Sequence, residues 1–185
     1  MIYSILYPVY YVNLATANTS PQVWRMWQNQ KGMTINIEDN RSIHATRDQV
    51  YRALNDDRIL SQCIPGCRDL TKTSDTQMIA DAQLKIGPIK ANFKFDVTLY
   101  DLNPPFSYSI RGQGKGGAAG FAKGEAKINL IDNGASTTII YVVHAEVGGK
   151  LAQIGSRLVD QAARHLSNEF FTKFSVLVEH QQVQT

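Results

Sequence analysis

The chain is poor in the residues that metal centres and disulfide frameworks require. Its 185 residues include two cysteines, Cys63 and Cys67, and four histidines, which are scattered and form no pair. A structural zinc site takes four ligands, and two cysteines across a Pro-Gly turn do not make a disulfide framework. We therefore expect no metal and no cofactor. A bridged or redox-active cysteine pair stays open beside inert thiols.

A strong charge of either sign is also missing. The formal net charge is +3, and Arg25 and Lys31 supply two of these positives within residues 1–32, a segment without acidic residues. The rest of the chain is near +1. Nucleic-acid-binding proteins usually carry a basic face or stripe, so we expect no nucleic-acid partner.

The N-terminal segment has no hydrophobic run long enough to cross a bilayer. Residues 1–14 are apolar and contain four tyrosines, but Pro8 interrupts them and they fall short of about 20 residues. No Lys or Arg precedes Arg25, as a signal peptide would need, although Ala15-Thr16-Ala17 resembles a cleavage site. Residues 1–32 therefore have three interpretations: a misassigned start or disordered leader, a membrane-surface or partner-binding segment, or a signal peptide.

The sequence is rich in segments of alternating polarity, which predict β-strands. The clearest is 91–99, where Ala, Phe, Phe, Val and Leu alternate with polar residues. Thr46 to Gln49 fits a helix capping box, and a second short helix is expected at 56–62. Gly87-Pro88, the segment 103–105 and the segment 132–134 are expected turns. The other predicted strands are 34–45, 68–73, 80–86, 106–110, 122–130 and 136–147.

One long helix is predicted from Leu151 to about Glu179. Its apolar residues recur at spacings of three and four, and Arg157 and Arg164 lie on the opposite, exposed side. The apolar set is Leu151, Ile154, Leu158, Ala162, Leu166, Phe170, Phe174 and Leu177. We expect one domain over residues 33–180, preceded by the leader 1–32 and followed by a short polar tail, 181–185.

The predicted fold class is α+β. Six or seven antiparallel strands would form a curved sheet whose apolar face is covered by the long helix. A strongly curved sheet does not close flush on a straight helix, so we expect an apolar cavity between them. We expect nine residues to line it: Ile64, Leu84, Ile86, Phe93, Phe95, Tyr108, Tyr141, Leu158 and Ala162.

Two patterns that suggest chemistry have simpler explanations. The segment Gly112 to Gly117 fits Gly-x-Gly-x-x-Gly, but a dinucleotide site needs a helix directly after the loop, and here a strand follows. We therefore expect a glycine-rich part of the sheet, where missing side chains permit a bend or leave room inside. His144 and Glu146 share one face of a strand, which the predicted alternation places outward.

Tyr108 and Tyr141 are candidates for ligand contacts. Their hydroxyl groups either bond the polar head of a ligand, or the two residues are amphipathic core tyrosines.

Three segments together resemble the family of the carbon monoxide dehydrogenase G subunit (CoxG), within the START-like (SRPBCC) helix-grip superfamily. They are Cys63 to Cys67, Gly112 to Gly116 and, most specifically, Gly148 to Leu158. The resemblance implies a helix-grip fold and an accessory protein of a molybdenum-containing carbon monoxide dehydrogenase or a related hydroxylase. It also implies handling of a lipophilic quinone and recruitment of the enzyme to the membrane. Many members carry a hydrophobic C-terminal segment, whereas only five residues, 181–185, follow the helix here, so we do not expect anchoring by such a tail.

Three hypotheses for function follow. The first is a non-catalytic binding protein for a quinone- or lipid-like apolar molecule, in the cytoplasm or at the inner face of the membrane. The second is an enzyme of the polyketide cyclase/dehydrase kind, which needs at least two polar or titratable groups in the pocket. The third is an assembly adaptor with a residual cavity, which a large exposed apolar patch would favour.

Overall fold

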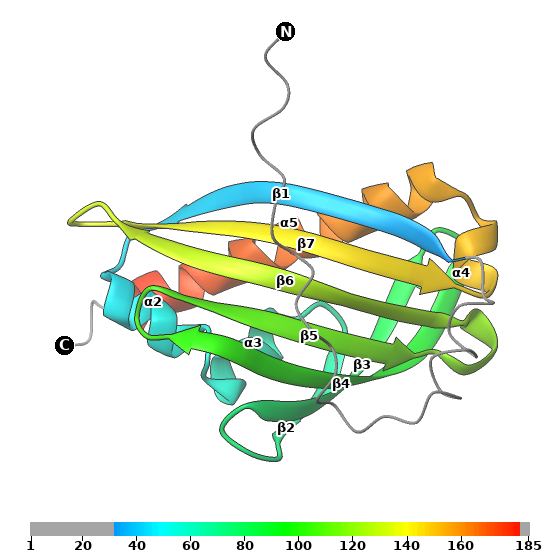
Figure 1. The fold of residues 1–185 in the computed structure, drawn as a ribbon, viewed down its shortest axis with the longest axis horizontal. Coiled ribbons are helices and arrows are strands. Elements are labelled where there is room, and N and C mark those ends of the chain that lie inside the picture. Colours follow the sequence, from blue (N-terminus) through cyan, green and yellow to red (C-terminus); the bar gives the residue numbers. More distant parts are fainter. Residues whose placement is uncertain (1–31, 182–185) are drawn as a thin grey trace, which may run out of the picture. The chain divides into compact units, whose positions relative to one another are not determined.

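A computed structural model describes residues 32–181. The predictions about the leader, and the polar tail beyond residue 181, lie outside this range. The described residues form the predicted α+β helix-grip architecture, a curved antiparallel sheet and a long C-terminal helix (Figure 1). No helix within 32–181 is long and apolar enough to span a bilayer.

The sheet has seven strands in the order β1-β7-β6-β5-β4-β3-β2, and every neighbouring pair is antiparallel. Six strands follow one another along the chain through tight turns, and β1 joins the sheet beside β7. The strands are β1 (Met33–Ile43), β2 (Cys67–Lys72), β3 (Gln77–Ile86), β4 (Ile89–Asn103), β5 (Ser107–Lys115), β6 (Phe121–Asp132) and β7 (Thr137–Gly148). All the predicted strands are therefore present.

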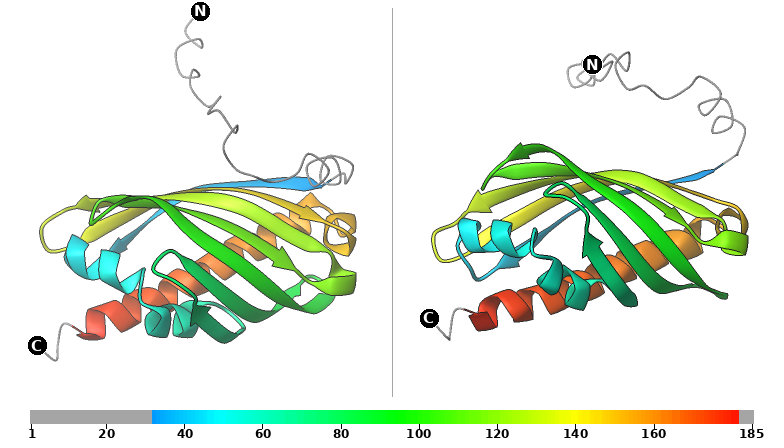
Figure 2. Two further views of the ribbon diagram at one scale, coloured as in Figure 1. Left: turned by 60° about the horizontal axis from the view of Figure 1, so that its bottom comes forward. Right: turned by 90° about the horizontal axis from the view of Figure 1, so that it is seen from below.

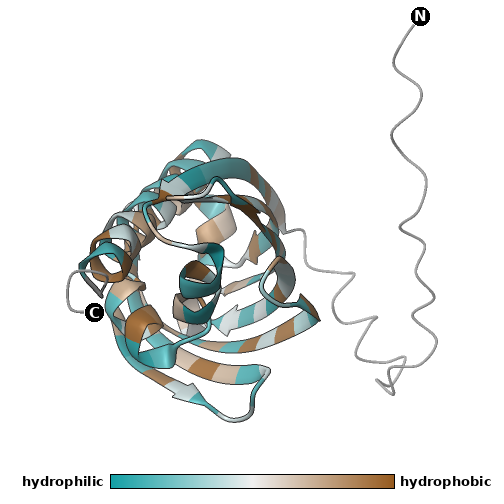
Figure 3. Ribbon diagram, turned by 90° about the vertical axis from the view of Figure 1, so that its left-hand side faces the viewer, coloured by the Kyte–Doolittle hydropathy of each residue, from teal (hydrophilic) through white to brown (hydrophobic). Residues whose placement is uncertain are grey.

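The alternating sequence gives the sheet one face toward the interior and one toward solvent. Ile139, Tyr141 and Val147 of β7 are buried, whereas His144 is exposed, as the predicted alternation requires. Figure 3 shows the same alternation as bands of hydrophilic and hydrophobic colour along the strands. The apolar face of the sheet therefore needs a cover.

Helix α5 (Ser156–Gln181) supplies that cover. The sheet curves around it, and α5 packs against β1 and against helix α3 (Asp57–Cys63) (Figure 2). Phe174 and Val178 of α5 are at most 2% exposed. Their burial joins the helix to the hydrophobic core.

The prediction of one continuous helix from Leu151 is wrong in one respect, because the helix is interrupted at Gly155. A short helix, α4 (Lys150–Gln153), ends two residues earlier, and Gly155 has φ of 91° before α5 begins. This left-handed backbone interrupts the helical repeat and changes which side chains face inward. Val159 is consequently buried, whereas Leu158, predicted to face the core, is 42% exposed.

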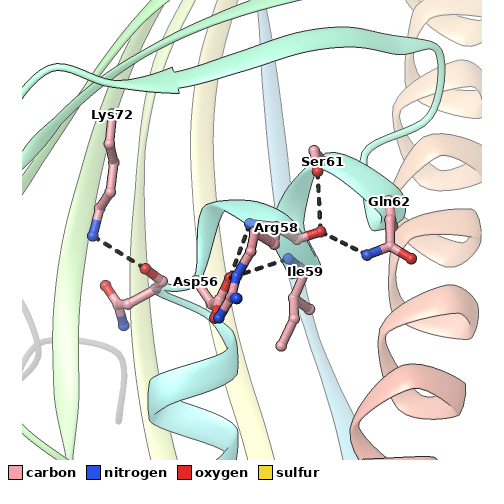
Figure 4. Close-up of polar contacts among 7 residues, drawn as sticks. Asp56, Arg58, Ile59, Ser61, Gln62 and Lys72 are labelled. Carbon is pink, nitrogen blue, oxygen red and sulfur yellow. Dashed lines mark hydrogen bonds and ion pairs between the residues drawn. The ribbon is translucent and has the colours of Figure 1, made fainter.

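Helices α2 (Arg47–Ala53) and α3 lie near the C-terminal end of α5 (Figure 2). The predicted capping box is confirmed, since Thr46 and Gln49 bond each other reciprocally at the start of α2. Asp56 caps α3 by accepting hydrogen bonds from the backbone N–H groups of Arg58 and Ile59 (Figure 4). Side-chain caps therefore fix where both short helices begin.

The glycine-rich segment is part of the sheet and a bend, as predicted. β5 runs to Lys115, a single 3₁₀ turn, η1 (Gly117–Ala119), follows, and β6 begins at Phe121. At Gly114 and Gly116 an added Cβ would lie 2.3 Å from the rings of Phe95 and Phe93, respectively. These glycines therefore leave space for aromatic rings from the neighbouring strand β4.

Candidate functional site

A groove with a volume of about 750 Å³ lies between α5 and the strand β3. β3 and the turn after α3 supply one wall, and α5 supplies the other. Pockets for small molecules usually measure about 300–1,000 Å³, so this groove is large enough for one. Its apolar lining includes Leu84, Leu158, Ala162 and Leu166, and its polar lining includes Gln83, Lys85, Gln161, Arg164, His165, Asn168 and Glu169.

The groove brings together three of the nine predicted cavity residues. Leu84, Leu158 and Ala162 line it. Four others are buried in the core, and two are partly buried outside the groove lining, so the predicted lining and the observed groove overlap only in part. The buried four are Ile86, Phe93, Tyr108 and Tyr141; the partly buried two are Ile64 and Phe95.

The two tyrosines predicted as ligand contacts differ in their surroundings. The Tyr141 hydroxyl lies 2.8 Å from Ser167 Oγ and donates to Asp39 Oδ2 at 3.3 Å. Tyr108 packs edge-on against Tyr51, with ring centroids 5.7 Å apart, and its burial raises the pKa of its hydroxyl. Tyr141 is therefore an amphipathic core tyrosine whose hydroxyl already has partners.

A second, smaller pocket of about 220 Å³ lies on the β1 side of α5, where Tyr141 and Arg164 both line it. Arg41 forms an ion pair with Asp39 at 2.7 Å and also donates to Asn168 of α5. Burial raises the pKa of Asp39, but the Asn40 backbone hydrogen bond and the Arg41 charge outweigh it, so the pKa is lowered overall. These contacts fasten α5 to β1 and satisfy the charges of Arg41 and Asp39.

The predicted outward pair on β7 is engaged at the surface. His144 Nδ1 lies 2.7 Å from Asn36 Oδ1, and Glu146 forms an ion pair with Lys123 at 3.0 Å. Neither residue lines the groove. Across residues 32–181 there is no group of three or more His, Cys, Asp or Glu side chains arranged to hold a metal ion.

The two cysteines are free thiols. Cys63 is buried in the core, and its burial raises the pKa of the thiol to about 11. Burial also raises the pKa of Cys67, and the nearby Asp69 adds to that rise. Because the thiolate is the reactive form, both environments favour the inert interpretation over a redox pair.

The polar lining of the groove was not predicted from the sequence. The periodicity of the helix places Arg164 on an exposed face and assigns no role to Lys85 and His165, yet all three line the groove beside its apolar residues. The spacing of Leu158, Ala162 and Leu166, four residues apart, is the signal that could have located it. This stripe lies along one side of the helix, next to the more deeply buried stripe of Val159, Phe174 and Val178.

A family model for the G subunit of carbon monoxide dehydrogenase (CoxG) matches residues 40–178. The chain belongs to the CoxG family. The match includes the short helices α2, α3 and α4, six complete strands and nearly all of α5, so it covers the elements that build the groove. No curated protein matches the sequence.

The chain is also similar to solved structures. A conserved protein from Geobacillus kaustophilus is 33% identical, with 79% of this chain and 96% of that chain covered and a TM-score of 0.75. A START superfamily protein from Mycobacterium smegmatis is 15% identical (79% and 98% covered, TM-score 0.62). The Zhui aromatase/cyclase from Streptomyces sp. R1128 is 12% identical (80% and 96% covered, TM-score 0.61). The last two similarities support the helix-grip fold that this CoxG-family chain adopts.

Proposed function

We propose that this protein binds a quinone- or lipid-like apolar molecule in the groove between α5 and β3 and performs no chemistry on it. The observation that carries this proposal is the groove of about 750 Å³ with Leu84, Leu158 and Ala162 in its lining. Membership of the CoxG family supports an accessory role beside a molybdenum-containing carbon monoxide dehydrogenase or a related hydroxylase. We further propose that it acts in the cytoplasm, at the inner face of the membrane.

An enzyme of the cyclase/dehydrase kind is the second candidate, because a histidine and a carboxylate, groups that could act as acid and base, line the groove. His165 and Glu169 are one helical turn apart on α5. The Glu169 carboxylate, however, accepts a hydrogen bond from Lys173 Nζ at 2.8 Å, which holds it in an ion pair. If the protein is such an enzyme, His165→Ala should abolish turnover and leave ligand binding intact; in a binding protein there is no turnover to lose.

An adaptor role is favoured by apolar side chains at the end of the sheet near α2. Leu102 and Phe106 flank the β4–β5 turn and Ile131 lies near the end of β6; they are 46%, 47% and 47% exposed, respectively. The Leu130 backbone N–H donates to the Phe106 carbonyl, which places the turn beside β6. Phe106→Ser should then weaken binding to the purified partner enzyme without changing ligand binding in the groove.

Native mass spectrometry of the full chain, purified without detergent, followed by solvent extraction tests the main proposal. We expect one apolar molecule per chain. Ala162→Trp places a large ring in the groove and should displace the bound molecule. Val176→Trp is the matched control, because Val176 lies on the same helix, is 50% exposed and does not line the groove. Equal ligand content in both variants would refute the groove as the binding site.

A further inference from the structure

The walls of the groove carry two cations whose charge is not balanced nearby. Lys85 lies on β3 and Arg164 on α5, and both line the groove. Within residues 32–181 neither side chain forms an ion pair. The acidic residue in the lining, Glu169, is neutralised by Lys173. The groove therefore presents a positive charge beside its apolar surface.

Arg164 differs in this respect from Arg41, which lies on β1 beside α5. Both Arg41 and Arg164 line the smaller pocket on the β1 side, but Asp39 holds Arg41 in an ion pair of 2.7 Å. Arg164 also lines the large groove, and its guanidinium is available to an anionic partner there. A guanidinium matches carboxylate and phosphate oxygens with two parallel N–H donors, so oxyanions are the natural partners of such a group.

We propose that the occupant of the groove is an amphiphile with one apolar chain and an anionic carboxylate or phosphate head. Leu84, Leu158 and Ala162 contact the chain, and Arg164 and Lys85 bind the head. This inference rests on the proposed function and narrows its ligand to the lipid-like class, because a quinone carries no carboxylate or phosphate head. Lys85 and Arg164 are exposed, so a neutral ligand would leave both cations to water, whereas an anionic head would pair with them.

Isothermal titration calorimetry with the full chain tests the head group, below the micelle-forming concentration of each probe. Dodecanoate, dodecyl phosphate and 1-dodecanol share one chain and differ in the head, and inorganic phosphate supplies a head without a chain. We expect both anionic amphiphiles to bind roughly tenfold more tightly than 1-dodecanol, as charge-assisted hydrogen bonds allow. Their relative affinity distinguishes a carboxylate from a phosphate ligand.

Two variants and one control locate the head. Arg164→Gln and Lys85→Gln should each lower the affinity for the anionic amphiphiles about threefold to tenfold and leave 1-dodecanol unchanged. Arg157→Gln is the matched control, because Arg157 is an exposed arginine of α5 that does not line the groove. Raising the salt concentration should reduce the difference in affinity between the anionic amphiphiles and 1-dodecanol, since salt screens exposed charges.

The outcomes separate the inference from the proposed function. If 1-dodecanol binds as tightly as dodecanoate, or if both variants still prefer the anionic amphiphiles, the inference of an anionic head is refuted. The proposal that an apolar ligand binds in the groove is then unaffected. Inorganic phosphate binding as tightly as dodecyl phosphate would refute the amphiphile, because the chain would contribute nothing. If no chain compound binds and Ala162→Trp changes nothing, the proposed function fails and the inference fails with it.

Discussion

Glycine determines where aromatic rings pack on the sheet. Phe93, Phe95 and Phe121 each lie against a glycine, namely Gly116, Gly114 and Gly148. Phe93 is only 2% exposed, so its ring cannot move into solvent to make room for a larger neighbour. The glycines of this region thus make room for aromatic rings, whereas the sequence alone predicted only a bend or free space.

Gly116→Ala should destabilise the fold by about 1–3 kcal/mol, because the new Cβ would lie 2.3 Å from the Phe93 ring. Gly112→Ala is the control: its Cβ would meet nothing within 4 Å, and Gly112 does not have a positive φ. That change should be neutral or stabilising by up to about 1 kcal/mol. Urea denaturation measures both, and equal stability of the two variants would contradict the packing argument.

The long helix depends on the break that precedes it. Gly155 has φ of 91°, and a Cβ there would meet no atom within 4 Å, so only the backbone conformation demands glycine. Because the break sets the rotation of α5, it decides that Val159 is buried and that Leu158 lies in the groove. The periodicity of the sequence predicted the helix but not this rotation.

Gly155→Ala should lower the free energy of unfolding by about 1–2 kcal/mol, the cost of a left-handed backbone for an L-residue. Gly155→Asn should lose less, because asparagine tolerates this region better. Chemical denaturation followed by circular dichroism gives both values. Equal losses for alanine and asparagine would mean that the conformation at residue 155 is not what the substitution disturbs.

The cap of α3 makes stability depend on pH. The Arg58 side-chain hydrogen bond is the largest influence on Asp56; burial opposes it, and backbone hydrogen bonds from Arg58 and Ile59 add to it, so the pKa of Asp56 is lowered (Figure 4). A lowered pKa in the folded state stabilises the fold above the unfolded value of about 3.9, and this stability is lost as pH falls through the folded pKa.

Asp56→Asn tests this dependence, since asparagine still caps a helix but carries no charge. We expect the variant to be less stable than the parent at pH 7. The difference should shrink as pH falls below about 4, where the carboxyl is protonated in the unfolded chain, and should vanish once pH is below the lowered pKa of folded Asp56. Thermal unfolding from pH 2.5 to 7 measures it, and a difference that stays constant over this range would rule out the charge as its source.

At the scale of the whole domain, the sheet curves around α5 and leaves the groove on one side of the helix. On the other side, contacts from Arg41 and Tyr141 fasten α5 to the sheet. The groove therefore lies between elements that are far apart in sequence, β3 and α5, and a ligand seated there would hold them together.

Ligand binding should accordingly stabilise the whole domain. At a ligand concentration 100 times the Kd, the free energy of unfolding should rise by about 2.7 kcal/mol. The urea midpoint should increase with ligand concentration in the parent and in Val176→Trp, and stay constant in Ala162→Trp. A rise of the same size in Ala162→Trp would place the binding site elsewhere.

The sequence by itself determined the architecture of residues 32–181. Alternation in 91–99 and its neighbours, the cap at Thr46 and the apolar repeat of the last helix each follow from local periodicity, which is written into adjacent residues. The family resemblance was likewise contained in short segments, and the match over residues 40–178 confirmed it.

Only the tertiary structure decided how these elements meet. It placed Phe93 and Tyr108 in the packed core and Leu158 in the groove, because the rotation of α5 after Gly155 and the curvature of the sheet set the distances between distant strands and helix. It also put Arg164 beside an apolar lining, although the sequence showed an arginine on an exposed helix face. Periodicity states which face of an element is apolar, whereas a binding site depends on the space that two such faces leave between them.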